Sequence, residues 1–372
     1  MLNSNDLPYY KVKLIRILME HTMRYPHMTA QDAWKLCYQG AFGGGHLITD
    51  QTAAMLRLHK ERKTMILASP DVPLFEEVGF DLVRLNLNVP DAERLSDDLI
   101  LRMFIASAER IQRREDNTVR FSVAVEGLKL LAAQNLLPFS KEDLAKVKKA
   151  YDRAPRAMHH SAQYNDRYHP AYRVMEQTYQ RLLPLLLKIE SALSAHENDN
   201  EPVLVAIDGR AGSGKSSLAE AISVLYGCNV FHMDDFFLPF SMRTDDRLKS
   251  PGGNVHYERF RSEILDNLRT GQPFSFYPFD CGTGDLRAPV SVSPAKLNII
   301  EGSYALHPYF GDAYDIRSAV LCSPEQQKKR LRRRDGEEMW KMFESRWIPM
   351  EETYFNTYSI YKDKNILVID NE

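Results

Sequence analysis

The first half of the chain carries apolar residues mainly at spacings of three and four. Such spacing gathers the apolar side chains on one face of a helix, so it predicts amphipathic helices that pack together. One short strand is also expected, at residues 81–87. We therefore predict a mainly α-helical domain over residues 1–195, with helices at 10–23, 30–38, 98–113, 123–134, 141–150 and 171–193.

The second half alternates between short apolar runs and longer helical patterns, and the polar segment 196–202 separates it from the first half. Strands that alternate with helices indicate a parallel sheet covered by helices, a three-layer α/β domain over residues 202–372. The predicted strands are 203–207, 229–233, 297–300, 318–322 and 365–369. The predicted helices are 215–226, 257–269, 324–334 and 336–361.

The composition is ordinary for a globular protein, with 372 residues, 44% hydrophobic and 26% charged. A formal net charge of −2 gives no overall field that would favour nucleic acid or an anionic membrane. The four cysteines show no C-x-x-C spacing, which argues against a zinc knuckle and for a reducing compartment. The sequence shows neither a signal peptide pattern nor a long apolar run, so we expect a cytoplasmic protein.

One motif identifies candidate chemistry. Gly209, Gly214, Lys215 and Ser216 fit the pattern G-x-x-x-x-G-K-[ST], between a predicted strand and a predicted helix. Glycines let backbone N–H groups turn inward around phosphate oxygens, and the helix directs its positive end at the anion. Against the alternative of a chance glycine turn, this context favours a site for ATP and Mg²⁺, with Lys215 on the phosphates and Ser216 on the metal. The predicted phosphate-binding residues are Gly209, Arg210, Ala211, Gly212, Ser213, Gly214, Lys215, Ser216 and Ser217.

Four further segments resemble, in the same order, the uridine kinase and phosphoribulokinase-like group of P-loop kinases. Segment 229–239 resembles the family's second strand, which ends in an Asp followed by aromatic residues. Segment 297–307 resembles its Walker-B-like strand, which ends in Glu-Gly, and 330–335 resembles its arginine-rich lid. Segment 364–370 resembles the closing strand, so the resemblance covers about residues 203–372.

The resemblance implies catalytic roles. Asp234 would be the base that accepts the proton of the acceptor hydroxyl, with Asp235 as its neighbour on the substrate side; the two roles are open to exchange, and both residues are also good helix N-caps. Glu301 would hold Mg²⁺ together with Ser216, or else cap the next helix. The lid arginines would neutralise transition-state charge, against the alternatives of a solvated helix face or a nucleic-acid patch; they are Arg330, Arg333 and Arg334, with Asp335 positioning one of them.

The acceptor side departs from the family pattern. His256 stands about where the family carries an Asp that grips ribose hydroxyls, which puts a ribose acceptor in doubt because imidazole offers only one acceptor atom. Tyr277, Asp280 and Arg287 resemble the family's acceptor loop, and His307 is either a cavity residue or a structural one. We therefore expect an ATP-dependent kinase for a small-molecule hydroxyl, with uridine or a similar nucleoside as first candidate.

Two alternatives remain open. The first is another hydroxyl acceptor, such as a different riboside, a vitamin precursor or a sugar acid. The second is a nucleotide-gated regulator whose helical half binds a partner. In that half, the segments 38–46 and 158–170 are rich in glycine, histidine and polar residues, and they would form either one anion or metal site or only a tight turn and a polar loop.

Overall fold

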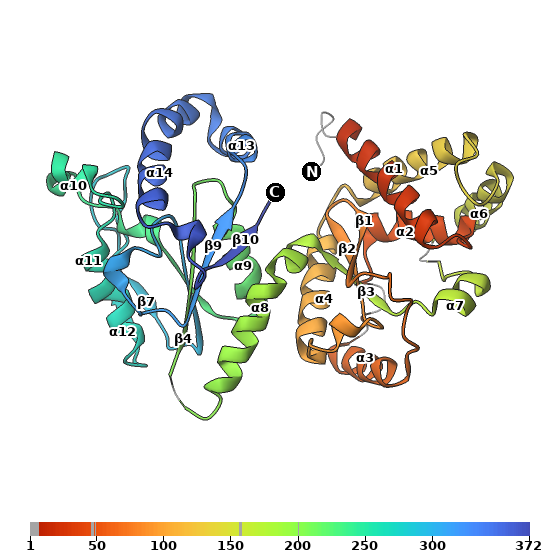
Figure 1. The fold of residues 1–372 in the computed structure, drawn as a ribbon, viewed down its shortest axis with the longest axis horizontal. Coiled ribbons are helices and arrows are strands. Elements are labelled where there is room, and N and C mark those ends of the chain that lie inside the picture. Colours follow the sequence, from red (N-terminus) through yellow and green to blue (C-terminus); the bar gives the residue numbers. More distant parts are fainter. Residues whose placement is uncertain (1–6, 46–47, 49, 156–157, 200) are drawn as a thin grey trace. The chain divides into compact units, whose positions relative to one another are not determined.

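The computed structural model describes residues 7–372 except 46–47, 49, 156–157 and 200, and the chain forms two compact units, Met1–Gln180 and Arg181–Glu372 (Figure 1). The boundary lies at Gln180 and not at the predicted residues 195–202. The reason is that helix α8 (Gln177–Ala195) packs with the second unit from Arg181 onward. Arg181 Nη1 donates to Asn371 Oδ1 at 2.9 Å, and Tyr226 Oη donates to Glu190 at 2.7 Å.

The first unit is mainly helical, as predicted, but it also contains an antiparallel sheet in the order β1-β2-β3. Its strands are β1 (Phe75–Gly79), β2 (Leu82–Asn86) and β3 (Tyr172–Glu176). The helix predicted at 171–193 is therefore wrong over its first residues, because Tyr172–Glu176 pairs with the distant strand β2. The helices are α1 (Leu7–Arg24), α2 (Ala30–Phe42), α3 (Gln51–Thr64), α4 (Asp97–Gln112), α5 (Asn117–Ala133), α6 (Lys141–Arg153) and α7 (Ala162–Tyr168), with a 3₁₀ turn at Pro90–Ala92.

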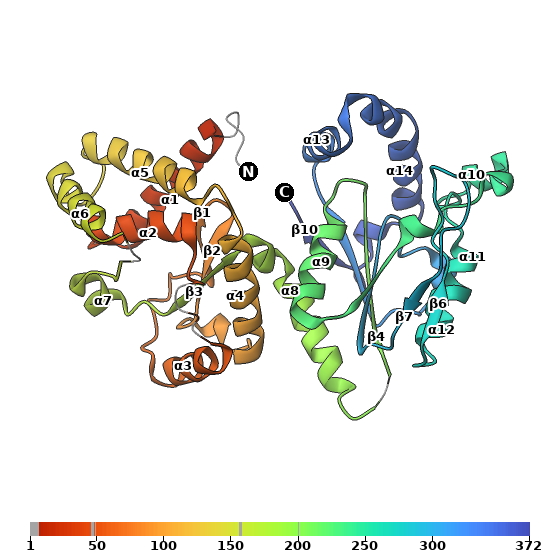
Figure 2. The same ribbon diagram turned by 180° about the vertical axis from the view of Figure 1, so that it is seen from behind.

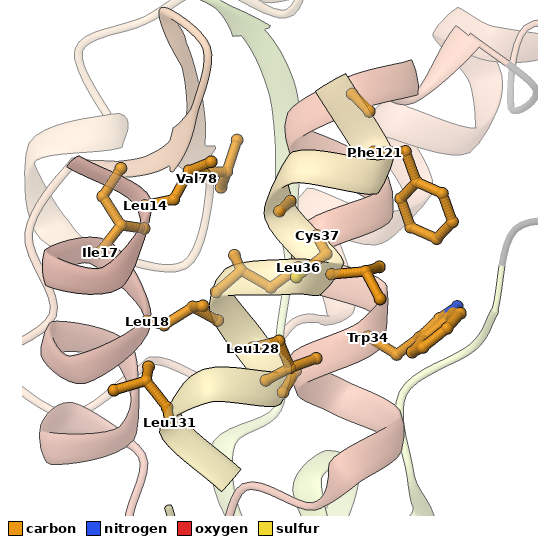
Figure 3. Packing of buried hydrophobic residues seen from close by; sticks show 14 of the residues in the cluster. Leu14, Ile17, Leu18, Trp34, Leu36, Cys37, Val78, Phe121, Leu128 and Leu131 are labelled. Carbon is orange, nitrogen blue, oxygen red and sulfur yellow. The ribbon is translucent and has the colours of Figure 1, made fainter. Parts of the chain in front are cut away.

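The apolar faces of α1, α2 and α5 form the core of the first unit (Figure 3). Leu14, Ile17 and Leu18 of α1 recur at spacings of three and four, so they meet α2 and α5 from one face of the helix. Trp34 of α2 packs edge-on against Phe121 of α5, with ring centroids 5.6 Å apart. This core holds the small sheet against the helices.

The second unit contains a parallel sheet in the order β10-β9-β4-β8-β5, which confirms the predicted α/β class. Helices α8 and α9 lie on one side of the sheet and α11 and α12 on the other (Figures 1 and 2). The strands are β4 (Val203–Gly209), β5 (Asn229–His232), β8 (Leu297–Glu301), β9 (Ile316–Leu321) and β10 (Leu367–Asp370), with a separate hairpin of β6 (Phe274–Phe276) and β7 (Val290–Val292).

The main helices of the second unit follow the predicted pattern. They are α9 (Lys215–Tyr226), α10 (Asp245–Lys249), α11 (Tyr257–Phe260), α12 (Asp266–Leu268), α13 (Pro324–Met342) and α14 (Ile348–Thr357). Single turns of 3₁₀ or π type occur at Met233–Phe236, Phe240–Met242, Arg261–Leu265, Pro308–Phe310, Phe343–Trp347 and Ile360–Lys362. Among the described residues, no helix combines the length and apolar character that crossing a membrane requires.

Candidate active site

A glycine loop joins β4 to α9 at the carboxyl edge of the parallel sheet. All seven residues of β4 are buried, and α9 begins at Lys215, so the predicted strand–loop–helix context is confirmed. Gly212 and Gly214 have φ of +73° and +98°, which residues with a side chain rarely adopt. A Cβ on Gly214 would lie 2.3 Å from Asn371 Nδ2. The loop is therefore a tightly fitted backbone cradle of the kind that binds phosphate.

Lys215 lies in this loop with a largely buried side chain. Its Nζ donates to Arg210 O at 2.9 Å and lies 3.5 Å from Ser303 Oγ. Both hydrogen-bond partners are neutral, and Lys215 forms no ion pair among the described residues, so its ammonium group can pair with an anion in the cradle. Ser216 and Ser217 follow in the first turn of α9, where both are exposed.

Residues far along the sequence fix the loop from outside. Glu351 of α14 is buried and accepts hydrogen bonds from the Ala211 N–H at 3.0 Å and from Ser303 Oγ at 2.7 Å. Asn371 Nδ2 donates to Ser213 O at 2.7 Å. The predicted loop residue Arg210 directs its guanidinium away, into an ion pair with Glu352 and over the Tyr361 ring.

Neither Glu351 nor Asn371 was found from the sequence, because their contacts with the loop span at least 140 residues. Burial raises the pKa of Glu351, and the Lys215 ammonium opposes that change. The loop is therefore positioned by a carboxyl group whose charge depends on pH.

Strands β5 and β8 bring two titratable side chains together beside the loop. His232 and Glu301 are paired in register, and His232 Nδ1 lies 2.5 Å from Glu301 Oε1. The hydrogen bond to Glu301 raises the pKa of His232. Sequence reasoning identified Glu301 and missed His232, although a histidine one residue before the end of the predicted strand was a visible signal.

Asp234 follows β5, and four titratable side chains act electrostatically on its carboxyl group. The residue is partly exposed, and among the described residues its carboxylate accepts no hydrogen bond. Loss of water to the surrounding protein raises its pKa; Lys215 opposes this and Glu301 adds to it. His232 and Arg334 also act on this carboxyl. The Asp234 carboxyl thus lies in the electrostatic field of residues from the loop, β5, β8 and α13.

Asp235 faces a different partner. Its Oδ1 accepts from Arg287 Nη2 at 2.5 Å, so two residues that were predicted on the acceptor side form an ion pair. The Asp235 carbonyl oxygen also accepts from the Phe279 N–H at 2.7 Å. Adjacent carboxylates therefore point to separate surroundings, Asp234 to the loop and metal side and Asp235 to the segment around residue 280.

The other residues predicted on the acceptor side form hydrogen bonds within the protein, and these bonds decide which of their atoms remain for a ligand. His256 Nδ1 accepts from the Arg259 N–H at 3.3 Å and caps α11, so only its Nε2 remains for a ligand. Asp280 Oδ1 closes a turn by accepting from the Gly282 N–H at 2.7 Å. Tyr277 is exposed, and its carbonyl oxygen accepts from Arg259 at 2.6 Å.

His307 has a structural environment. Its Nε2 lies 3.2 Å from Pro251 O, and its Nδ1 accepts from the Tyr309 N–H at 3.2 Å. The ring stacks on Tyr257 with centroids 4.4 Å apart. Both ring nitrogens are used within the protein, so the geometry favours the structural alternative stated above.

The arginine-rich segment lies on α13 and divides into two parts. Arg330 binds the carbonyl oxygens of Ser213 at 3.1 Å and Asn371 at 2.7 Å, so it anchors the loop. Arg333 and Arg334 are exposed, and Asp335 binds Arg334 Nε at 2.9 Å, as expected. Directly after them Gly336 breaks the helix with φ 83° and ψ 176°.

The donor set at this edge fits Mg²⁺. Ser216, Glu301 and Asp234 offer oxygen ligands, which Mg²⁺ prefers together with water and phosphate oxygens. Within the described residues no group of three His, Cys, Asp or Glu side chains could hold a metal alone.

No family model matches the chain, and no curated protein matches it. Solved structures do match. A possible uridine kinase from Bacillus stearothermophilus is 18% identical, with 50% of this chain and 99% of that chain covered and a TM-score of 0.37. A candidate fructose transport system kinase from Silicibacter sp. TM1040 is 19% identical over 47% and 94% of the two chains, with a TM-score of 0.40. The YGR205w protein is 16% identical over 52% and 94%, with a TM-score of 0.38.

The matched structures are uridine kinase-like and related P-loop kinases, the group that the sequence of the second half resembles. They cover about half of the chain. Identities of 16–19% concern the fold and say nothing of the substrate. What the protein does is therefore judged from its own residues.

Proposed function

We propose that the second unit is an ATP-dependent kinase that transfers the γ-phosphate of ATP to a hydroxyl of a small molecule. The observation that carries this proposal is geometric: β4 ends in the glycine cradle with the buried Lys215, and the neighbouring strands β8 and β5 end at the same edge of the sheet in Glu301 and, directly after His232, Asp234. Phosphoryl transfer needs phosphate positioning, a metal, a base and charge neutralisation, and these groups supply one candidate for each.

In the proposed reaction Asp234 accepts the proton of the acceptor hydroxyl. The acceptor oxygen forms a bond to the γ-phosphorus, and the bond from that phosphorus to the β–γ bridging oxygen breaks, which leaves ADP. A raised pKa suits this role because it brings the carboxyl closer to the pH at which a base works best. Mg²⁺, when bound by Ser216 and Glu301, would neutralise phosphate charge.

The acceptor would lie between Asp234 and the Asp235–Arg287 pair, with Tyr277 and His256 Nε2 at hand. Hydroxyl groups can both donate to Asp235 and accept from Arg287, so a polyhydroxylated acceptor fits. Uridine or a similar nucleoside remains the first candidate, and we place the protein in the cytoplasm with no nucleic acid or membrane partner.

The test is a screen of ADP release with Mg²⁺ against nucleosides, sugars, sugar acids and vitamin precursors. One class of acceptor should raise ATP turnover, chelation of Mg²⁺ should stop it, and Asp234→Asn should return it to the level without acceptor. ATP binding without turnover on any acceptor class would favour the nucleotide-gated regulator instead.

A further inference from the structure

The first unit contains a cavity of about 290 Å³ between its sheet and the segment around α7. The cavity is lined from several elements, among them Tyr25 after α1, Arg84 and Asn86 of β2, Tyr164 of α7 and Tyr172 of β3. Its volume suits a small molecule. Nothing in the kinase proposal uses this cavity.

Arg84 is the central feature of the wall, because its side chain is 1% exposed and yet it has no carboxylate partner. Among the described residues, no Asp or Glu oxygen lies within ion-pairing distance of its guanidinium. Its Nε and Nη2 both donate to Gln39 Oε1, at 3.1 and 2.7 Å, and its Cζ lies 4.4 Å from the Tyr172 ring centroid. Its hydrogen-bond partners are neutral, and the negative charge nearest in the sheet is the buried Glu76, which lies opposite Arg84 in the β1–β2 pair without an ion-pairing contact.

A chain of hydrogen bonds fixes the orientation of Arg84. Gln39 Nε2 donates to Tyr172 Oη at 3.0 Å, and Tyr172 Oη lies 2.6 Å from His160 Nε2. His160 Nδ1 lies 2.9 Å from Asp32 Oδ1. Burial lowers the pKa of His160 to about 4, so the ring is neutral and takes the Tyr172 proton on Nε2. The guanidinium is therefore held rigid before any ligand arrives.

The nearby carboxylates are occupied by other groups. Asp32 accepts from His160, from Thr29 Oγ1 at 2.7 Å and from Ser161 Oγ at 2.7 Å. Glu76 in the cavity wall accepts from three groups, Arg24 Nη1 at 2.8 Å, Tyr25 Oη at 2.9 Å and Asn86 Nδ2 at 3.0 Å. Glu76 acts on Arg84 from the neighbouring strand but forms its ion pair with Arg24, so a carboxylate or phosphate in direct contact with the Arg84 guanidinium would have to come from a ligand.

The rest of the wall offers further recognition. Asn86 and Asn88 give their Nδ2 hydrogens to the carbonyl oxygens of Pro73 and Ile66, so their amide oxygens remain for a donor on a ligand. Tyrosine rings supply apolar faces, with the centroids of Tyr25 and Tyr164 5.3 Å apart. Two further arginines line the cavity, Arg24, which is paired with Glu76, and the exposed Arg167; the exposed Asp71 lies in the same lining.

We propose that this cavity binds a small organic oxyanion, whose carboxylate or phosphate pairs with Arg84 and whose body donates hydrogen bonds to Asn86 and Asn88 between the tyrosine rings. The segment 158–170 and Gln39 of segment 38–46 both contribute to its walls or supports, so the two polar clusters seen in the sequence meet here. His46 lies outside the described residues.

The first experiment soaks crystals of the full chain with selenate, a phosphate-like ion, and separately with 4-bromobenzoate, an aryl carboxylate. The two probes would locate the site and show whether it prefers a phosphate or a carboxylate group. We expect anomalous density within hydrogen-bonding distance of the Arg84 guanidinium with at least one probe. Selenate at the glycine loop would serve as a positive control. Density at the loop and none at Arg84 with either probe would overturn the proposal.

Calorimetry in solution completes the test, using inorganic phosphate and benzoate on a Lys215→Ala chain so that the loop contributes no phosphate site. Arg84→Gln should abolish binding. Because that variant changes a buried residue, the exposed Arg167→Glu provides a second test and should weaken binding about tenfold. Arg113→Glu, which changes another exposed arginine of the same unit outside the cavity lining, should not. Equal affinities of the two Glu variants, or no binding heat with either probe, would refute the site.

Discussion

The two units each bury a cation, Lys215 in the second and Arg84 in the first, but they assemble its surroundings in opposite ways. Lys215 belongs to nine consecutive residues, and its nearest partner is the carbonyl of Arg210 in the same loop. Arg84 depends on Gln39, Tyr172, His160 and Asp32, which are spread over about 140 residues of sequence. The contiguous site can be recognised by a pattern, whereas the dispersed one becomes visible only after folding.

The largest effect is expected from Lys215→Ala. Loss of the ammonium removes charge stabilisation of the transferring phosphate, so ATP turnover should fall by at least about 10²–10³-fold. The fold should persist, because Lys215 makes one good hydrogen bond and no ion pair among the described residues. Steady-state ADP release measures the loss. The control is Lys364→Ala, which removes an exposed lysine of the same unit. An equal loss of ATP turnover in this variant would show that the effect does not depend on the loop.

Asp234→Asn should lower kcat by about 10²-fold or more while ATP affinity changes little, because asparagine keeps the shape and cannot take a proton. Asp235→Asn should mainly raise KM for the acceptor, since it weakens the pair with Arg287. Both constants come from initial rates with acceptor varied. If the two variants exchange these effects, Asp235 is the base and the assignment is off by one residue.

Glu351 tests the part of the loop site that is assembled from distant sequence. Burial raises its pKa above that of the unfolded chain, so its contribution to stability is full below the unfolded pKa and is lost as pH rises through the folded value. The native chain should therefore lose stability relative to Glu351→Gln as the pH rises from the unfolded pKa of Glu351 through its higher folded pKa. The loss should be about 1.4 kcal/mol for each pH unit that separates the folded pKa from the unfolded one. Urea unfolding of both proteins across that range measures it; a difference independent of pH contradicts the raised pKa.

The smallest effect concerns Arg84. A buried guanidinium without a carboxylate partner adds little to folding, so Arg84→Met combined with Gln39→Leu should leave the free energy of unfolding within about 1 kcal/mol of native. The free energy of unfolding of the first unit, measured from its transition in urea, tests this. A loss of several kcal/mol, beyond about 3, would make Arg84 a structural residue and remove the contrast with Lys215.

Prediction from the sequence succeeded where structure follows local pattern. The strands of the parallel sheet are short apolar runs between helices, and each was predicted within two residues of its observed ends. Strand β3 was missed because its partner β2 lies far away in the sequence. Strand β1, which forms a local hairpin with β2, was also missed. Helix α3 was missed because its apolar residues are few and only Ala54 and Leu58 are buried.

The candidate site divides in the same way. The loop, Glu301, Asp234 and Asp235 were found because each lies at the end of an apolar run. The hydrogen bonds of His256 and His307 were not predicted. The sequence does not show that their Nδ1 atoms accept from the backbone N–H groups of Arg259 and Tyr309. Arg330 was predicted to move over phosphates, whereas its hydrogen bonds to Ser213 and Asn371 hold it on the loop.

The bend of α13 at Gly336 depends on a backbone conformation that is open to one handedness of amino acid and closed to the other. A Cβ built there meets nothing within 4 Å, so space does not require a glycine at this position. Its φ of 83° with ψ of 176° is a region that L-residues avoid and that D-residues occupy freely, being close to the mirror image of extended backbone. D-alanine at 336 should therefore keep the angle between the helical stretches before and after this residue, whereas L-alanine should change it. The handedness of a single α-carbon thus sets the direction in which the chain continues after the arginine-rich segment.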